Sequence, residues 1–263
     1  MECAAKCAKL NCASFSFDTA SEICTIYGNA SYGGWMNVTT GIQTAMMQRQ
    51  GPLVDCSDLC CTNCSGVYSI TPVKGTTFDV YCETDIIGGP WTVIQRRFDG
   101  SVDFYRNWED YKQGFGNVNG EYWLGLEYIY SLLQLDQRLY ILLESWNGTA
   151  KHAEYESFSI KDESFNYNLT IDGFSGNVVD KFSQHGHQQF STYDRDNDIT
   201  NRTCASFARG GFWYRNCYAI NLNGIYMMDE GTDERRSMNW NHFFPDRRQM
   251  PLRKCSMMIK RRR

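Results

Sequence analysis

The sequence predicts a mixed α+β fold in a disulfide-rich, secreted protein. Strand-like runs of aromatic and branched residues, a short helical stretch between them, and twelve cysteines among 263 residues carry this prediction. An even, high number of cysteines is typical of proteins that fold outside the reducing cytosol. Six N-x-[ST] sequons agree with an extracellular location: Asn29, Asn37, Asn63, Asn147, Asn168 and Asn201.

Composition argues against several partner classes. The net charge is −4 and positive and negative residues are mixed along the sequence, so the sequence does not predict a basic surface for nucleic acid. We interpret the basic end, Lys260–Arg263, as a solvated terminus. No apolar run is long enough to span a bilayer. No signal-peptide pattern starts at Met1 although the cysteines call for export, so we expect the sequence to be a fragment.

The first part of the chain contains a cysteine pattern of its own. Cys3 and Cys7 lie four residues apart on one face of a predicted helix over Met1–Leu10. Cys12–Phe17 and Cys24–Tyr27 are predicted strands. The pattern resembles the middle of a PAN/apple module that lacks its first strand, and such modules bind proteins or carbohydrate. The resemblance implies the pairs Cys3–Cys24 and Cys7–Cys12.

The elements of the larger part follow in order. Trp91–Phe98 and Leu139–Leu143 read as strands, and Asp99-Gly100 reads as a hairpin turn after the first of them. Tyr128–Leu135 is a predicted short helix. From Asn166 onward, strand-like pieces alternate with long polar stretches, so we expect the distal half to be rich in loops.

Motifs in this part resemble the fibrinogen-related domain, in order and with family-like spacing. They are SGVY (65–68), YCETD (81–85), the run at 88–125, AEYESFSI (153–160), FSTYDRDND (190–198), NLNGIY (221–226) and MMIK (257–260). The resemblance implies a central, mainly antiparallel sheet and a loop-rich distal subdomain with calcium and a ligand pocket. We therefore expect a partial PAN/apple-like module at 1–48, a linker at 49–54 and a fibrinogen C-terminal-like domain at 55–263.

The cysteines of this domain fall into two groups. The resemblance implies the pairs Cys56–Cys82 and Cys204–Cys217. Four further cysteines are additional to the family pattern: Cys60, Cys61, Cys64 and Cys255. Either Cys255 pairs with one of the other three, or some of them form bridges between chains and make a homo-oligomer. A zinc site at Cys61 and Cys64 is the weakest alternative, because no second ligand pair is visible.

An alternating carboxylate run precedes Cys204. Asp194, Asp196 and Asp198 can present oxygens to one cation, and Ca²⁺ takes about 6–8 oxygen ligands. The resemblance implies calcium ligands from the side chains of Asp196 and Asp198 and the carbonyls of Thr200 and Arg202. It leaves Asp194 as a turn residue. An EF-hand is excluded, because its glycine and closing glutamate are missing.

The resemblance also places a ligand pocket beside Cys217, where Asn216-Cys217 matches the position of a family cis peptide. Ala208, Tyr218 and Glu234-Arg235 depart from the pattern that binds acetyl groups. Aromatic side chains can still stack on a sugar or peptide, although core packing is the favoured interpretation of Trp213. The candidate ligand-binding residues are Phe207, Ala208, Trp213, Asn216, Cys217, Tyr218, Glu234 and Arg235.

Catalysis is not predicted. The sequence contains no GxSxG, HExxH or phosphate-binding glycine loop, and His185-Gly186-His187 reads as a solvated turn rather than a metal site. Two functions remain. The first is a calcium-stabilised lectin for glycans, N-acetylated ones included, on microbial or host surfaces, with a role in innate immunity. The alternative is a protein-interaction module that binds a receptor as angiopoietin-like ligands do, or self-assembles as fibrin does.

Overall fold

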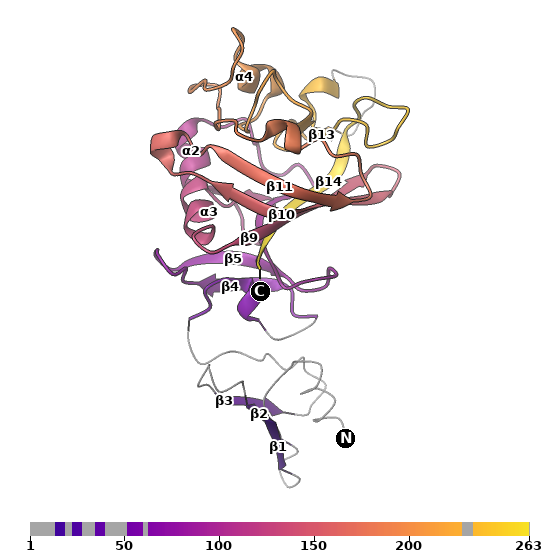
Figure 1. The fold of residues 1–263 in the computed structure, drawn as a ribbon. Helices are drawn as coiled ribbons and strands as arrows, with labels where there is room; N and C mark the ends of the chain where they lie inside the picture. The colour runs from indigo at the N-terminus through magenta and orange to yellow at the C-terminus, as the bar shows by residue number, and fades with distance from the viewer. Residues whose placement is uncertain are drawn as a thin grey trace. The chain divides into compact units, whose positions relative to one another are not determined.

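The computed structural model describes residues 52–59, 63–227 and 234–262. Earlier in the chain it describes only the backbone of three strands (Figure 1), which are β1 (Ser14–Asp18), β2 (Ile23–Tyr27) and β3 (Trp35–Thr39).

These three strands form one antiparallel sheet in the order β1-β2-β3, in which Phe17 lies opposite Cys24. β1 and β2 overlap the predicted strands at Cys12–Phe17 and Cys24–Tyr27, whereas the sequence does not predict β3. The predicted helix over Met1–Leu10 lies outside the described residues. So do Asn29 and the side chains needed to judge the predicted pairs Cys3–Cys24 and Cys7–Cys12.

The chain folds as two compact units, residues 1–72 with 76–92 and residues 73–75 with 93–263. In the first unit, Leu53 is 4% exposed and forms a parallel bridge with Ile70. The amide of Thr71 donates to the carbonyl of Leu53 at 2.6 Å. Leu53, which the sequence assigns to the linker, is therefore packed against a strand of the domain, because its side chain is apolar and its carbonyl is hydrogen-bonded.

The first unit also holds an antiparallel hairpin and a disulfide. Its strands are β4 (Gly66–Ile70), β5 (Phe78–Glu83) and the start of β6 (Trp91–Arg97). A short 3₁₀ helix, η1 (Cys56–Asp58), begins where the Asp55 side chain accepts from the amide of Ser57. Cys56 is bonded to Cys82 with their Cα atoms 5.5 Å apart, which is one of the two pairs that the family resemblance implies.

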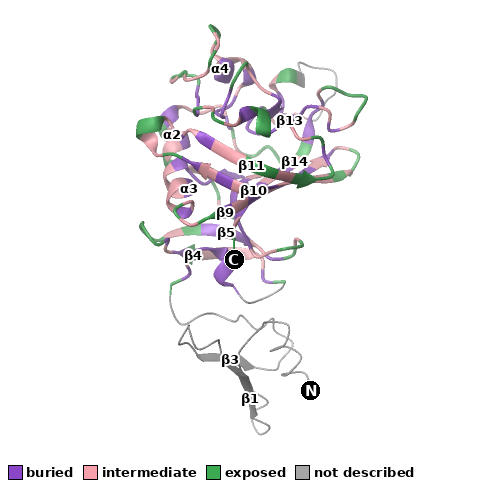
Figure 2. Cartoon of the chain, viewed as in Figure 1, coloured by how far each residue is buried: buried purple, intermediate pink, exposed green. Residues whose placement is uncertain are grey.

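The second unit contains most of the sheet, with the strand order β11-β10-β9-β14-β6. The bounds are β9 (Gln137–Ser145), β10 (Ala150–Ile160), β11 (Leu169–Gly176) and β14 (Leu252–Arg261). Neighbours from β11 to β14 pair antiparallel. Leu139, Ile141 and Leu143 alternate along β9 and are fully buried, as expected of a strand with one face on the core. Strand β11 ends the sheet, and much of its length is exposed (Figure 2).

Two short helices lie side by side next to this sheet (Figure 1), α2 (Trp108–Gln113) and α3 (Leu126–Leu132). Helix α3 starts two residues before the helix predicted at Tyr128–Leu135. Helix α2 is not predicted, although Asn107 caps it by accepting from the amide of Asp110 and Gly114 follows it. None of the helices in the described part of the chain is long and apolar enough to cross a membrane.

The turn at Asp99-Gly100 does not lead into a hairpin. Instead of a second strand after β6, residues 98–107 form a loop that leads into α2. The Glu121 carboxylate accepts from the amides of Phe98, Asp99 and Gly100 at 2.6, 2.9 and 2.9 Å. The prediction of a hairpin is wrong because a distant buried carboxylate, rather than a partner strand, satisfies these amides.

The distal part of the second unit is rich in loops, as predicted from Asn166 onward. Three short elements precede it: β7 (Phe115–Gly116), β8 (Tyr122–Trp123) and η2 (Glu163–Phe165). The short elements within it are η3 (Ser183–His185), α4 (Cys204–Ala208), β12 (Ile220–Asn221), η4 (Glu234–Arg236) and β13 (Asn239–Trp240). An aromatic cluster holds the loops together: the Trp213 ring contacts those of Trp123, Phe182 and Phe190. Burying each such ring stabilises the fold by roughly 1.5–3 kcal/mol.

The structure gives the bonding state of two of the four additional cysteines, Cys255 and Cys64. Cys255 is a buried free thiol, and burial raises its pKa to about 12. It therefore does not pair with the cluster at residues 60–64, and its burial keeps it from bridging to another chain. Cys64 is disulfide-bonded, with its partner outside the described residues. A thiol in a disulfide cannot ligate zinc as a thiolate, so the zinc alternative is wrong for Cys64.

Candidate functional site

The loop with the alternating aspartates starts from the aromatic core. Ser191 and Phe212 exchange two backbone hydrogen bonds of 2.9 and 3.1 Å. The Asn197 side chain donates to the carbonyl of Phe190 at 2.7 Å, and the Asn197 amide donates to the Ser191 hydroxyl at 3.0 Å. Phe190 itself is fully buried. Backbone and core contacts therefore hold the start of the loop in place, and with it the backbone that carries the aspartates.

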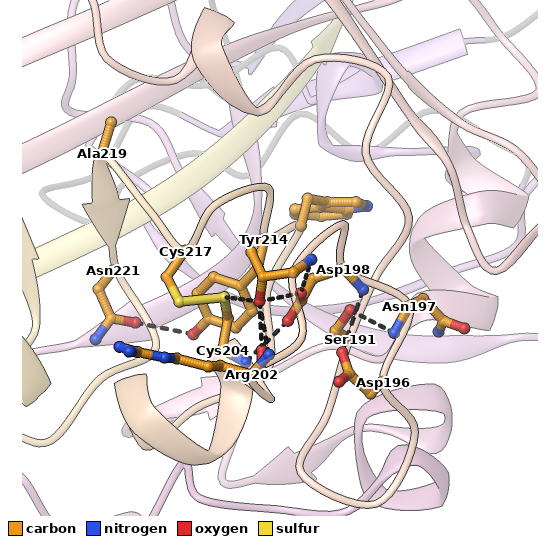
Figure 3. The surroundings of a disulfide bond; sticks show 12 residues. Ser191, Asp196, Asn197, Asp198, Arg202, Cys204, Tyr214, Cys217, Ala219 and Asn221 are labelled. Atoms are coloured by element: carbon orange, nitrogen blue, oxygen red, sulfur yellow. Dashed lines mark hydrogen bonds between the residues drawn. A yellow bond between two sulfur atoms is a disulfide. The ribbon is translucent and has the colours of Figure 1, made fainter.

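Asp198 organises the second half of this loop (Figure 3). Its Oδ1 accepts from the amide and the hydroxyl of Thr200 at 2.8 and 2.9 Å, and its Oδ2 accepts from the amide of Cys204 at 2.8 Å. The Thr200 hydroxyl also lies 2.6 Å from the carbonyl of Arg202. The Thr200 hydroxyl thus links two of the four expected calcium ligands, the Asp198 carboxylate and the Arg202 carbonyl, whereas the Thr200 carbonyl takes no part in these contacts.

The fourth expected ligand, Asp196, lies in the same loop. Burial and the nearby Asp198 carboxylate raise the pKa of Asp196 above its ordinary value, while hydrogen bonds from the Asp198 amide and from Thr203 oppose the rise. Two carboxylates placed this way repel each other, and a bound cation relieves that repulsion. The donors are hard oxygens, which fits Ca²⁺. No third His, Cys, Asp or Glu joins them within the described residues, so backbone carbonyls and water would complete the shell.

Asp194 has a different role. Its Oδ1 accepts from the amide of Trp108 at 2.9 Å and from the hydroxyl of Thr192 at 2.7 Å. Trp108 is the first residue of α2, where a backbone amide has no partner inside the helix. Asp194 therefore satisfies the start of a helix and is already engaged away from Asp196 and Asp198.

A disulfide joins this loop to the next segment. Cys204, the first residue of α4, is bonded to Cys217 with their Cα atoms 5.0 Å apart, the second pair that the resemblance implies. The cis peptide expected at Asn216-Cys217 is absent. The cis bond found among residues 52–59, 63–227 and 234–262 is Gly89–Pro90, so the expectation that Asn216-Cys217 is a cis peptide is wrong.

A cavity of about 740 Å³ opens beside Cys217. Its size falls in the range of about 300–1,000 Å³ that is common for ligand sites. Its walls come from five separate segments: Lys181, Gln184, His185, Ile199, Arg215, Asn216, Cys217, Tyr218, Ala219, Asn241, His242 and Arg248. These described lining residues include three permanent cations and no aspartate or glutamate.

His185 lines this cavity, and both of its ring nitrogens are hydrogen-bonded within the protein. Its Nδ1 lies 2.8 Å from the carbonyl of Trp213, and its Nε2 accepts from the amides of Ala219 and Ile220 at 3.0 and 3.2 Å. These contacts require a neutral ring with the proton on Nδ1. Burial lowers the pKa of His185 to about 4. The prediction that residues 185–187 form a solvated turn is wrong for His185, which is 1% exposed.

The predicted ligand-binding residues divide into three groups. Asn216, Cys217 and Tyr218 line the cavity. Ala208 and Trp213 are fully buried, and the indole Nε1 of Trp213 donates to the carbonyl of Tyr167 at 2.8 Å. Neither can contact a ligand, because each is packed into the core; the prediction is wrong for both.

Phe207 and Arg235 form the third group, on an aromatic face that does not line the cavity. The Phe207 ring stacks near Tyr218 with centroids 6.5 Å apart, and the Arg235 guanidinium lies 5.5 Å from the Phe207 ring. Glu234 begins η4, and its side chain is outside the described part. The sequence reasoning missed Lys181, Asn241 and Arg248, because no local pattern marks residues that only the fold brings together.

The sequons differ in availability. Asn63, Asn147 and Asn201 are exposed. The Asn168 amide nitrogen, the atom that would carry a glycan, donates to the carbonyl of His187 at 2.9 Å.

Comparisons with known proteins agree with the fold. Curated relatives include mouse angiopoietin-related protein 7, 42% identical over 190 residues, and human angiopoietin-related protein 6, 45% identical over 179 residues. The matches cover 70% and 67% of this chain, and 56% and 38% of those proteins. The chain thus spans about half, or less, of the length of the curated relatives it matches.

Solved structures match as well. The fibrinogen-like globe domain of human ANGPTL6 has a TM-score of 0.76 and 38% identity, covering 85% of this chain and all of that one. Lamprey fibrin D-dimer, complexed with the peptide Gly-His-Arg-Pro-amide, has a TM-score of 0.71 and 32% identity, covering 80% and 74%.

The family model for the C-terminal globular domain of fibrinogen beta and gamma chains matches residues 53–262. The match begins after the proposed PAN/apple-like segment, which therefore gains no support from it. This domain is non-catalytic, which confirms the prediction that the chain is not an enzyme. The chain belongs to the family of fibrinogen C-terminal globular domains.

Proposed function

We propose that this chain is a secreted, calcium-stabilised recognition module that binds a protein partner, a receptor ectodomain in particular. The binding surface is formed by the cavity beside Cys217 and by Tyr218 at its edge. Calcium at Asp196 and Asp198 keeps the preceding loop in place. Disulfides at Cys56–Cys82 and Cys204–Cys217 support secretion, because such bonds persist outside the cytosol.

Two side chains favour a protein over an acetylated sugar as the ligand: Ala208 is buried, and Arg235 lies over the Phe207 ring. An acetyl methyl group needs an apolar cup with aromatic walls. Here the small side chain of Ala208 is fully buried, and the Arg235 cation covers Phe207. The relatives named angiopoietin-related proteins, and the peptide held by lamprey fibrin, support a protein partner for the same domain.

Cell-surface binding tests the proposal. The biotinylated full chain is titrated on mammalian cells in the presence of calcium, before and after the cells are treated with trypsin or with glycosidases. We expect trypsin to abolish binding and deglycosylation to leave it. Binding that survives trypsin and is lost on deglycosylation, with matching signals on an array of N-acetylated glycans, would support the lectin instead.

A matched pair of variants locates the surface. Tyr218→Ala removes a ring at the edge of the cavity, and we expect it to weaken cell binding by roughly tenfold or more, since aromatic side chains often dominate protein interfaces. Tyr130→Ala removes a half-buried tyrosine on α3, away from the cavity lining, and serves as the control. Equal binding by the two variants contradicts the placement of the surface.

A further inference from the structure

The cavity beside Cys217 carries one sign of charge. Acidic residues outnumber basic ones in the chain, 30 to 26. Yet the described residues that line this cavity include Lys181, Arg215 and Arg248 and no carboxylate. His185 adds no charge at neutral pH, because its ring is held neutral by the amides it accepts from. The positive potential of the cavity therefore comes from three side chains on three separate segments.

Among the residues that the structure describes, these three cations have no side-chain partner. Within residues 52–59, 63–227 and 234–262, no side-chain hydrogen bond or ion pair engages Lys181, Arg215 or Arg248. Some other cations of the described residues are paired, as Lys112 is with Glu163 at 2.7 Å. Like charges that face one cavity repel each other, and an anion bound between them removes that repulsion. Arginine is suited to this role, because its planar fork matches a carboxylate in two parallel hydrogen bonds.

A neutral acceptor in the same wall indicates what carries the anion. Asn241 is 7% exposed and lines the cavity, and its Oδ1 is buried without a hydrogen-bond partner in the described part of the chain. A buried acceptor without a donor is unfavourable, so a ligand with an N–H group gains affinity by donating to it. A peptide brings backbone N–H groups together with acidic side chains. Ile199, 65% exposed at the edge, adds an apolar contact for such a chain.

We propose that the cavity beside Cys217 binds an acidic segment of a protein partner. Aspartate or glutamate carboxylates of that segment pair with Lys181, Arg215 and Arg248, and a peptide N–H donates to Asn241. This inference rests on the proposed function, since it names the chemistry of the partner at the same surface.

Fluorescence anisotropy tests the inference with the full chain at an ionic strength of about 0.15 M, where weak surface attraction is screened. The probes are a fluorescein-labelled oligoglutamate peptide and its oligoglutamine counterpart. We expect saturable binding of oligoglutamate and no binding of oligoglutamine. Equal binding of the two peptides, or no binding of either, overturns the inference.

Charge-neutral variants place the binding in the cavity. We expect Arg215→Gln and Arg248→Gln each to weaken oligoglutamate binding roughly tenfold, the size of one charge-assisted hydrogen bond, and Lys181→Gln to weaken it less. Lys74→Gln is the control: it makes the same charge change at an exposed lysine that also lacks an ion pair in the described residues. If it weakens binding as much as the cavity variants, the effect is one of net charge and the inference is wrong.

A heparin-derived oligosaccharide distinguishes another source of anions. If it binds more tightly than oligoglutamate and depends on the same three cations, the occupant is a sulfated glycan and the acidic peptide is wrong. Cell binding by the same variants separates this inference from the proposed function. Trypsin-sensitive cell binding that survives Arg215→Gln with Arg248→Gln overturns the inference and leaves the proposed function intact.

Discussion

Two regions of the second unit concentrate charge in opposite ways. Around Glu121, two buried charges are paired inside the protein: the Glu121 carboxylate accepts from four backbone amides and lies 3.6 Å from Arg97. Arg97 in turn donates to the carbonyl of Gly224 at 2.9 Å and covers the Phe104 ring at 3.9 Å. Around the cavity beside Cys217, three cations have no side-chain partner in the part of the chain that the structure describes.

The difference separates charges that hold the fold from charges that are available for binding. Glu121 and Arg97 are 0% and 1% exposed, and they join the loop after β6 to the segment that precedes β13. Burial lowers the pKa of Arg97, and the Glu121 carboxylate opposes that shift. The cavity cations are exposed or half-exposed, and their side chains join no two segments among the described residues. Substitutions in the two regions should therefore give opposite patterns of stability and binding.

Glu121→Gln should give the largest effect. It leaves Arg97 buried without a countercharge and turns an NH₂ group toward backbone amides. We expect a loss of about 3–5 kcal/mol in the free energy of unfolding, measured by urea denaturation. Glu154→Gln is the control, because Glu154 pairs with Arg138 at 3.0 Å in a partly exposed site and should cost less than about 1 kcal/mol. Similar losses in the two variants would remove the distinction between the regions.

Acid should destabilise the fold through His185. Its folded pKa of about 4 lies below the ordinary value of 6.5, so the unfolded chain binds the proton more readily. The stabilisation is present above pH 6.5 and is lost as pH falls from there toward 4, to an extent of about 3 kcal/mol.

Urea denaturation at several pH values measures this loss. His185→Gln should flatten the difference between neutral and acidic pH, since no proton is then taken up at that site. His242→Gln, which changes a half-exposed histidine of the same cavity, should keep the wild-type slope. A His185 variant with the full wild-type slope contradicts the role assigned to this ring.

Calcium should have a smaller effect. A site with two carboxylates and a dissociation constant on the order of 10⁻⁴–10⁻³ M should stabilise the chain by about 0.4–1.4 kcal/mol at millimolar calcium. Thermal unfolding with calcium or EDTA measures it. Asp198→Asn should abolish the difference, and Asp246→Asn, at an exposed carboxylate elsewhere, should not. Equal calcium responses in all three proteins would exclude the site at Asp198.

The cavity cations should matter least for stability. We expect Lys181→Gln, Arg215→Gln and Arg248→Gln each to change the free energy of unfolding by less than about 0.5 kcal/mol, because each lies at the surface without an ion pair in the described residues. Urea denaturation beside the Glu121 variant checks this. A large loss in any of the three would show that the cation holds the fold after all.

Local patterns in the sequence predict much of the framework. Alternation along Leu139–Leu143 and Trp91–Phe98 predicts strands β9 and β6, and motif spacing implies the Cys204–Cys217 bridge. Long-range contacts are not predicted. Glu121 accepts from amides about twenty residues away, and His185 accepts from Ala219. The binding surface is the part that the sequence predicts least well. Lys181, Arg215 and Arg248 come together only in the folded loops, and the Trp213 ring packs among other aromatic rings instead of facing a ligand.

A crystal structure of the full chain with a bound oligoglutamate peptide tests the central claim most directly, that unpaired cations beside Cys217 are a binding site for acidic segments. We predict a glutamate carboxylate within hydrogen-bond distance of the Arg215 or Arg248 guanidinium, with a peptide N–H near Asn241. A peptide that lies instead over Phe207 and Arg235, with the cavity cations unengaged, would contradict the account.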